Sequence, residues 1–206
     1  MRLPTNAILL VLVFAGSAAA DNAAVNDAEA IVRKSFSTAT SDQWNARLKQ
    51  DEVQALCSQY RNKPPPKIAA RIVASQQRTL RYPPSRTTIG DWREGEKLAS
   101  IGTGGQLSSI KPEQANIRRG GNCYACHALA PSEVAAGNLG PSLTGFGKLR
   151  GTSPDAVKRT YEQIFNVQAF YPCSMMPRFG HNDWLTPEQI ADAVAFLLDP
   201  ESPVNK

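Results

Sequence analysis

The residues of this chain best suited to chemistry gather in one short segment. Cys123, Cys126 and His127 have the spacing C-x-x-C-H within the sequence GGNCYACHAL, residues 120–129. The chain has four cysteines and two histidines in total, so this segment holds half of each. Three kinds of site use such residues: a structural metal site, a redox-active dithiol and the attachment site of a haem.

The rest of the sequence argues against the first two kinds of site. A structural zinc site needs four ligands, commonly in two pairs, and the chain has no second C-x-x-C and no H-x-x-x-H. An iron–sulfur cluster would need more cysteines close together. A thioredoxin-type dithiol belongs to a fold with a parallel sheet, and no run of this sequence shows convincing strand alternation.

The spacing C-x-x-C-H is the attachment signature of a covalently bound haem. Two thiols on one turn of helix can bond to the two vinyl groups at one porphyrin edge, and the next residue then directs its imidazole at the iron. The sequence therefore predicts one haem c, attached through Cys123 and Cys126, with His127 as an axial iron ligand.

A haem bound by one histidine predicts a second axial ligand on the other side of the iron. The candidates are Met175, Met176 and His181. A thioether raises the reduction potential relative to a second imidazole, which suits an electron carrier. We favour Met176, with Met175 next and His181 third. The alternative for Met175 is a side chain that fills a gap in the core or beside the haem, and for His181 a solvent-facing turn residue.

The N-terminus has the three parts of a secretory signal peptide. Arg2 supplies a positive charge, residues 7–15 form an apolar run, and small residues follow up to Ala20. This run is too short to span a bilayer, which takes about 20 residues, so we expect cleavage after Ala20 and export to the periplasm. Loss of Arg2, the one charged residue in this segment, would change the formal net charge from +5 to +4. No later apolar stretch predicts a membrane span.

Helices must position these residues, and two are expected before the haem motif. Asp51 is a suitable N-cap for the first of them. Its apolar residues recur at i, i+3, i+4 and i+7, namely Val53, Leu56, Cys57 and Tyr60. The prolines at 64–66 end this helix, because proline lacks an amide donor and disfavours helix in the residue before it. A second helix is expected over about 67–80.

Three further helices are expected from residue 91 onward. One lies in DWREGEKLAS, residues 91–100. Ser153 followed by proline marks the start of the next. The last begins with the capping box Thr186 to Gln189, again with proline at the first helical position, and continues with an apolar stripe.

Several of these pieces, in this order, resemble the class I cytochrome c family: DWREGEKLA, CYACH, GPSLTG, MPRFG and LTPEQIADAVAFL. The resemblance implies an all-α fold in which an N-terminal helix crosses the C-terminal helix, with Gly95 allowing close approach near Val194. It also implies that the carbonyl of Pro141 accepts a hydrogen bond from His127, which fixes the ring. Met176 matches the family's distal ligand.

The resemblance covers about residues 88–200. We therefore divide the chain into a signal peptide (1–20), a helical N-terminal extension (21–87) and a cytochrome c domain (88–206). The expected fold class is all-α, a class I cytochrome c fold with an extra helical extension.

The motifs GNCYACHAL, NLGPSLTG and MMPRFGHNDWLTPEQIADAVAFLLDPESPVN also resemble the SoxX family. SoxX proteins are monohaem subunits of the SoxAX sulfur-oxidation complex. The resemblance implies a heterodimer with a SoxA-like cytochrome, transient contact with a SoxYZ-like carrier protein, and a downstream electron acceptor. Such a complex joins thiosulfate oxidatively to a carrier cysteine, as an L-cysteine S-thiosulfotransferase, with the catalytic site on the partner subunit.

Two other functions compete with this interpretation. One is a free-standing soluble electron shuttle in the periplasm. The other is a haem enzyme such as a peroxidase, which needs an open sixth position at the iron, and a methionine ligand speaks against it. A nucleic-acid partner does not fit an exported haem protein.

Cys57 and Cys173 do not belong to the cytochrome pattern. One hypothesis is a disulfide that ties the extension to the loop carrying Met176. The alternatives are a small buried apolar role for Cys57, and an iron-ligand or partner-binding role for Cys173.

The remaining charged residues suggest two further contacts. Arg178 follows the Met-Pro pair, where it could bind a haem propionate or lie free on the surface. Residues 53–90 contain seven Lys and Arg and no acidic residue. This segment is either a solvated face or a surface for an acidic protein or an anion such as thiosulfate.

Overall fold

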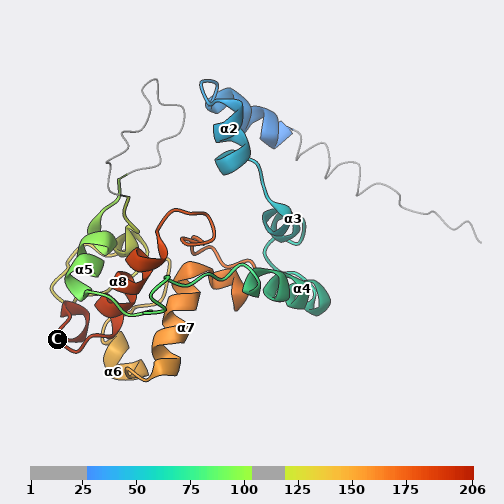
Figure 1. Ribbon diagram of the computed structural model, residues 1–206. Helices are drawn as coiled ribbons and strands as arrows, with labels where there is room; N and C mark the ends of the chain where they lie inside the picture. The colour runs from blue at the N-terminus through green and yellow to red at the C-terminus, as the bar shows by residue number, and fades with distance from the viewer. Residues whose placement is uncertain (1–26, 104–118) are drawn as a thin grey trace, which may run out of the picture.

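The computed structural model describes residues 27–103 and 119–206, and these contain helices, turns and loops but no strand (Figure 1). The all-α prediction is thus confirmed. The predicted signal peptide, residues 1–20, lies outside the described residues. Within the part of the chain that the structure describes, no helix is long and apolar enough to cross a membrane.

The main core forms where two helices from opposite ends of residues 88–206 cross. We call these residues the cytochrome half, or second half, of the chain. α5 (Trp92–Ser100) follows the N-cap Asp91, whose carboxylate accepts a hydrogen bond from the amide of Arg93. α8 (Pro187–Leu198) packs across it (Figure 1). This is the crossing of N-terminal and C-terminal helices that the family resemblance implies.

Gly95 permits the close approach of the two helices. A Cβ at this position would stand 2.1 Å from the backbone oxygen of Asp192 and 2.7 Å from the Cβ of Phe196. These residues flank Val194, the position expected from the sequence. Because any side chain at 95 would overlap backbone atoms of α8, glycine is the residue that allows this crossing.

α8 is buried on nearly every side. Its capping box is present: the side chain of Thr186 accepts a hydrogen bond from the amide of Gln189 (3.2 Å), and the Gln189 side chain accepts one from the amide of Thr186 (2.9 Å). The predicted stripe is only part of the buried surface, because α5, α6 and α7 all pack on this helix. Its buried residues are Ile190, Ala191, Ala193, Val194, Ala195, Phe196, Leu197 and Leu198.

α7 (Pro154–Phe165) starts as predicted, with the hydroxyl of Ser153 accepting a hydrogen bond from a backbone amide. It contributes Tyr161 and Phe165, both fully buried, to the core shared with α8. The short helix α6 (Phe146–Arg150) was not predicted from the sequence. A 3₁₀-helix, Val167–Ala169, continues the chain beyond α7, and another, Pro203–Asn205, closes the domain beside α8.

The N-terminal extension begins with helical residues 27–35, followed by α2 (Ser41–Gln43) and a π-helical turn, Trp44–Leu48. The guanidinium of Arg33 lies 3.8 Å from the centre of the Trp44 ring. Figure 1 shows this part apart from the helices of the second half.

Two longer helices of the extension approach the second half. α3 (Glu52–Gln59) has Asp51 as its N-cap, in a capping box with Gln54. α4 (Pro66–Gln77) starts one residue earlier than predicted, because Pro66 suits the first helical position, where no amide donor is needed. It ends three residues earlier than predicted.

α3 and α4 meet in a small apolar cluster, separate from the main core. Its buried members are Val53, Cys57, Ile72 and Cys173, and the first three come from the extension. The fourth belongs to the loop that carries the methionines. The extension therefore makes part of its core from the cytochrome half of the chain.

Candidate haem site

The C-x-x-C-H segment folds into a single helical turn. A 3₁₀-helix spans Cys123–Ala125, and the carbonyl of Cys123 accepts hydrogen bonds from the amides of Cys126 (3.1 Å) and His127 (2.9 Å). Neither cysteine takes part in a disulfide. Burial raises the pKa of the Cys123 thiol to about 11. The turn presents both thiols and the imidazole from one short piece of backbone.

The end of α5 fixes the entry to this turn. The amide of Gly121 donates to the carbonyl of Leu98 (2.8 Å), and the amide of Asn122 donates to that of Ile101 (3.0 Å). On the other side, the indole of Trp184 donates to the carbonyl of Gly120 (2.8 Å). A Cβ at Gly120 would lie 2.0 Å from the carbonyl oxygen of Ile101, so the segment runs directly against the helix end.

His127 is held in a defined tautomer. Its Nδ1 lies 2.7 Å from the carbonyl oxygen of Pro141. Because a carbonyl can only accept, Nδ1 carries the proton, and the lone pair of Nε2 remains available to a metal. A carbonyl partner on the second nitrogen is the usual support of a metal-binding histidine.

Two glycines let the following loop close over the turn. The amide of Gly137 donates to the carbonyl of Tyr124, and that of Gly140 to the carbonyl of Cys126, both at 2.8 Å. A Cβ at Gly137 would stand 1.9 Å from the carbonyl oxygen of Ala125. At Gly140 it would stand 2.2 Å from the imidazole Cε1 of His127. The loop thus forms a cradle around the turn, and its close approach depends on glycine at positions 137 and 140.

The three candidates for the second ligand differ in burial. Met175 is 73% exposed, so it does not fill a gap in the core. Met176 is partly buried and packs against the main core cluster. His181 is partly buried too, and burial lowers its pKa, assisted by the nearby guanidinium of Arg178. Of the two methionines, only Met176 is directed toward the core that supports the His127 turn.

These residues fit a haem better than a metal ion bound by the protein alone. Among residues 27–103 and 119–206, no three His, Cys, Asp or Glu side chains gather as metal ligands. The described site instead offers two thiols on one turn, an imidazole with a free Nε2 and a thioether from a separate loop. A haem would use all four.

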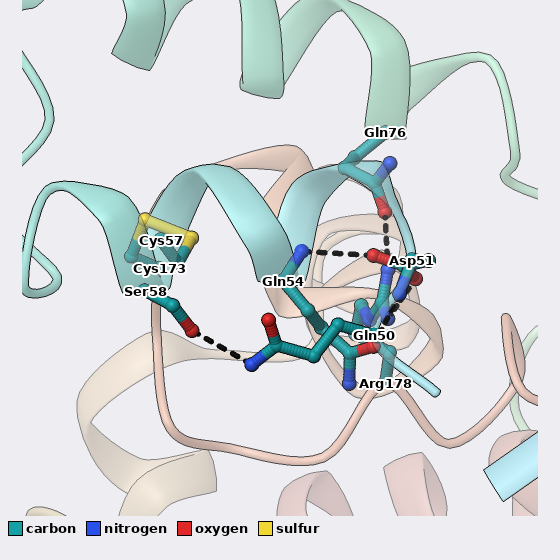
Figure 2. Close-up of a disulfide and its surroundings, with 8 residues drawn as sticks. All are labelled: Gln50, Asp51, Gln54, Cys57, Ser58, Gln76, Cys173 and Arg178. Carbon is teal, nitrogen blue, oxygen red and sulfur yellow. Dashed lines mark hydrogen bonds and ion pairs between the residues drawn. A yellow bond between two sulfur atoms is a disulfide. The ribbon is translucent and has the colours of Figure 1, made fainter. Parts of the chain in front are cut away.

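Arg178 is placed differently from the propionate contact expected from the sequence. Its guanidinium is only 4% exposed. One nitrogen donates to the carboxylate of Asp51 (2.5 Å) and another to the side-chain oxygen of Gln76 (3.1 Å; Figure 2). Both partners belong to the extension. The reason is spatial, because α3 and α4 cover this side of the loop and supply the charge and the acceptor.

Cys57 and Cys173 form a disulfide, with their Cα atoms 5.4 Å apart (Figure 2). It joins α3 to the methionine loop, as in the first of the hypotheses above. The alternatives, an iron ligand or a bond to a partner, would require a free Cys173 thiol.

The basic segment 53–90 is engaged in part. Arg71 pairs with Glu52 in the extension, at an exposed site. Arg81 donates to the carboxylate of Asp183 (2.5 Å) and to the carbonyl of Gly180 (3.0 Å), both in the second half. Part of this charge therefore links the extension to the cytochrome half.

Sequence reasoning did not find the buried polar residues at this junction. The side-chain oxygen of Gln76 accepts hydrogen bonds from the guanidinium of Arg178 and from the side-chain amide of Asn166 (2.9 Å). Asn166, which follows α7, also donates to the hydroxyl of Thr79 (2.9 Å). A signal existed for Gln76, which lies four residues after buried Ile72 and so on the inner face of α4.

Comparison with known proteins agrees with this site. The family model for cytochrome c matches residues 115–199. A protein of Aquifex aeolicus (strain VF5), described as an uncharacterized lipoprotein, is 42% identical over 158 residues, which cover 76% of this chain and 73% of that protein. This chain therefore contains a cytochrome c domain. A cytochrome c domain implies covalently bound haem c and a role in electron transfer.

Proposed function

We propose that this chain is a periplasmic monohaem cytochrome c with a filled iron coordination sphere. Cys123 and Cys126 would hold the haem as thioethers, and His127 and Met176 would bind its iron. The bound haem would supply a one-electron redox centre. The observation that carries this proposal is the pair formed by His127, whose Nε2 is left free by Pro141, and Met176, which is packed against the same core.

The protein's own groups would tune that centre. The carbonyl of Pro141 makes the imidazole of His127 a more basic ligand by accepting its Nδ1 proton. A thioether on the opposite side favours a higher reduction potential than a second imidazole would. Two protein ligands leave no open position for a substrate, so the chain would pass electrons without performing substrate chemistry at the iron.

The test of the ligand assignment is Met176→Ala. We expect loss of the near-infrared methionine–iron band and a lower reduction potential, whereas Met175→Ala, at the exposed neighbouring position, leaves both unchanged. If Met176→Ala retains the band, the ligand is assigned to the wrong residue. The intact mass of the exported protein should correspond to one haem per chain.

We further propose that this cytochrome is the electron-accepting subunit of a thiosulfate-oxidising heterodimer. Support comes from the SoxX-like motifs around Cys123 and Met176. In this role the partner, a SoxA-like cytochrome, would couple thiosulfate to a cysteine of a SoxYZ-like carrier, and this chain would pass the electrons to a downstream acceptor. The similar Aquifex protein is described as a lipoprotein, a class exported from the cytoplasm, which supports an extracytoplasmic place for this chain as well.

Isolation of the native protein tests this role. A second cytochrome should copurify with the chain, and thiosulfate together with the carrier protein should reduce the haem of the complex. A monomeric protein without a cytochrome partner, which thiosulfate does not reduce, would instead favour the free-standing shuttle.

A further inference from the structure

We propose that the N-terminal extension positions the axial methionine. Two ties join it to the loop of residues 173–178, namely the Cys57–Cys173 disulfide and the Asp51–Arg178 ion pair. We infer that these ties determine how readily Met176 leaves the iron. The inference rests on the proposed function in one respect, namely that Met176 is the distal ligand. Asp51, Gln76 and Cys57 are then positioning residues that act on Met176 through Arg178 and Cys173.

The ties lie on both sides of Met176 along the chain. The disulfide to Cys57 holds Cys173, three residues before the methionine. The hydrogen-bonded ion pair with Asp51 holds Arg178, two residues after it. Figure 2 shows both ties reaching the same helix, α3 and its N-cap, so one element of the extension grips both ends of the ligand loop.

The tie at Arg178 depends on the extension for electrostatic reasons. A guanidinium that is 4% exposed needs a counter-charge and acceptors, because a buried unpaired charge is strongly destabilising. Asp51 supplies the charge and Gln76 supplies an acceptor at 3.1 Å. Although burial alone would raise the pKa of Asp51, the amide of Gln54 and the guanidinium lower it, so the carboxylate stays ionised.

The tie at Cys173 holds an unfavourable backbone conformation. This residue has φ of +62°, in the left-handed region that residues other than glycine seldom adopt. The turn that starts the ligand loop therefore needs support from outside, and the bond to Cys57 supplies it. Both half-cystines are buried in the small apolar cluster of the extension.

Between α3 and the loop lies a cavity of about 280 Å³, and its lining includes Gln54, Ser58, Met176 and Pro177. The disulfide and the ion pair are the covalent bond and the charged contact that join α3 and its N-cap to the loop beside this cavity.

The extension is itself anchored to the cytochrome half, so it can act as a fixed support. The side-chain oxygen of Gln76 accepts from Asn166 as well as from Arg178. The side chain of Gln77 donates to the carbonyl of Ala169 (3.2 Å). These bonds fix α4 against the segment after α7.

Imidazole competition on the ferric holoprotein tests the inference, because imidazole binds where the methionine leaves. The matched pair is Asp51→Asn and Glu52→Gln. Both remove one negative charge, and asparagine caps a helix as well as aspartate does. Among the described residues, Glu52 pairs with Arg71, which also belongs to the extension. Asp51→Asn should raise the imidazole affinity about tenfold, a change of about 1.4 kcal/mol, and Glu52→Gln should leave it unchanged.

The double variant Cys57→Ser/Cys173→Ser tests the second tie without leaving an unpaired thiol. It should also raise the imidazole affinity about tenfold and weaken the near-infrared methionine–iron band. Asp51→Asn keeps the test decisive if the double variant does not mature, because it leaves the disulfide intact. Wild-type imidazole affinity in Asp51→Asn would overturn the inference.

The outcome for Met176→Ala separates this inference from the proposed function. If that variant loses the band but the tie variants bind imidazole as the wild type does, the ligand assignment stands and the positioning role falls. If Met176→Ala keeps the band, the ligand assignment fails, and the positioning role fails with it.

Discussion

The two apolar clusters of this protein differ in size and in what stabilises them. Among the described residues, the cluster around the α5–α8 crossing contains 16 buried members, drawn from many elements of the cytochrome half. The cluster of the extension contains four, and two of these are joined by the disulfide. A small cluster buries too little apolar surface to order its segment alone, and disulfides commonly supply the difference in such cases.

This difference assigns separate tasks to the two regions. In the cytochrome half, burial holds the helices, and short-range hydrogen bonds fix the turn and the loop around His127. In the extension, specific long-range bonds replace burial, through Asp51, Gln76 and Cys57. The extension, which has a small core of its own, thus holds the loop that carries Met176. The predictions below disturb each region in turn.

The largest effect is expected from Gly95→Val in the main core. Its side chain would overlap backbone atoms of Asp192, and because α8 is packed on nearly every side it cannot move away. We expect the free energy of unfolding to fall by about 3 kcal/mol, at the upper end for overpacking, with poor recovery of holoprotein. Denaturant unfolding monitored by haem absorbance measures it. Lys97→Ala, at an exposed site on α5, should change stability little.

Removal of the disulfide should loosen the extension more than the cytochrome half. Cys57→Ser/Cys173→Ser removes a crosslink that spans 116 residues, and such bonds contribute about 2–4 kcal/mol. We expect rapid proteolysis of α3 and α4, whereas the fragment that carries the haem stays folded. Limited proteolysis with mass spectrometry distinguishes the two. Equal protection of both regions from proteolysis in the double variant would mean that the fold of the extension does not depend on the disulfide.

Loss of the N-cap of α8, the helix at the centre of the main core, should have a moderate effect on stability. Thr186→Ala removes the side-chain acceptor for the amide of Gln189, and such changes cost about 1 kcal/mol. Thr186→Ser retains the hydroxyl and should be nearly as stable as the wild type. Thermal unfolding of the three proteins measures the difference. A larger loss in Thr186→Ser than in Thr186→Ala would contradict the capping role.

The smallest effect is a pH dependence at the junction of the two regions. Burial and the guanidinium of Arg178 lower the pKa of His181 below 6.5. The unfolded chain therefore binds the proton more tightly, and stability should decline as the pH falls below 6.5. Because His181 is only partly buried, solvent screening keeps this loss small. His181→Gln should flatten this part of the stability profile, and an unchanged slope would show that other groups cause it.

Features that depend on neighbouring residues could be predicted from the sequence alone. The spacing of Cys123, Cys126 and His127 predicted the haem turn, because one turn of backbone places all three. The capping box at Thr186 and the cap at Asp51 marked helix starts, since each is satisfied by an amide three residues away. The family resemblance that these motifs carry implied an all-α fold, which the structure confirms for the described residues.

Features that join distant parts of the chain became visible once the chain was folded. Arg178 and Asp51 are separated by 127 residues, and local pattern does not show which acceptor a charged side chain will meet. The adjacent residues Met175 and Met176 are equivalent by spacing, but the fold exposes the first and packs the second against the core. The physical reason is the same in both cases. Burial and ion pairing depend on what the rest of the chain places around a residue.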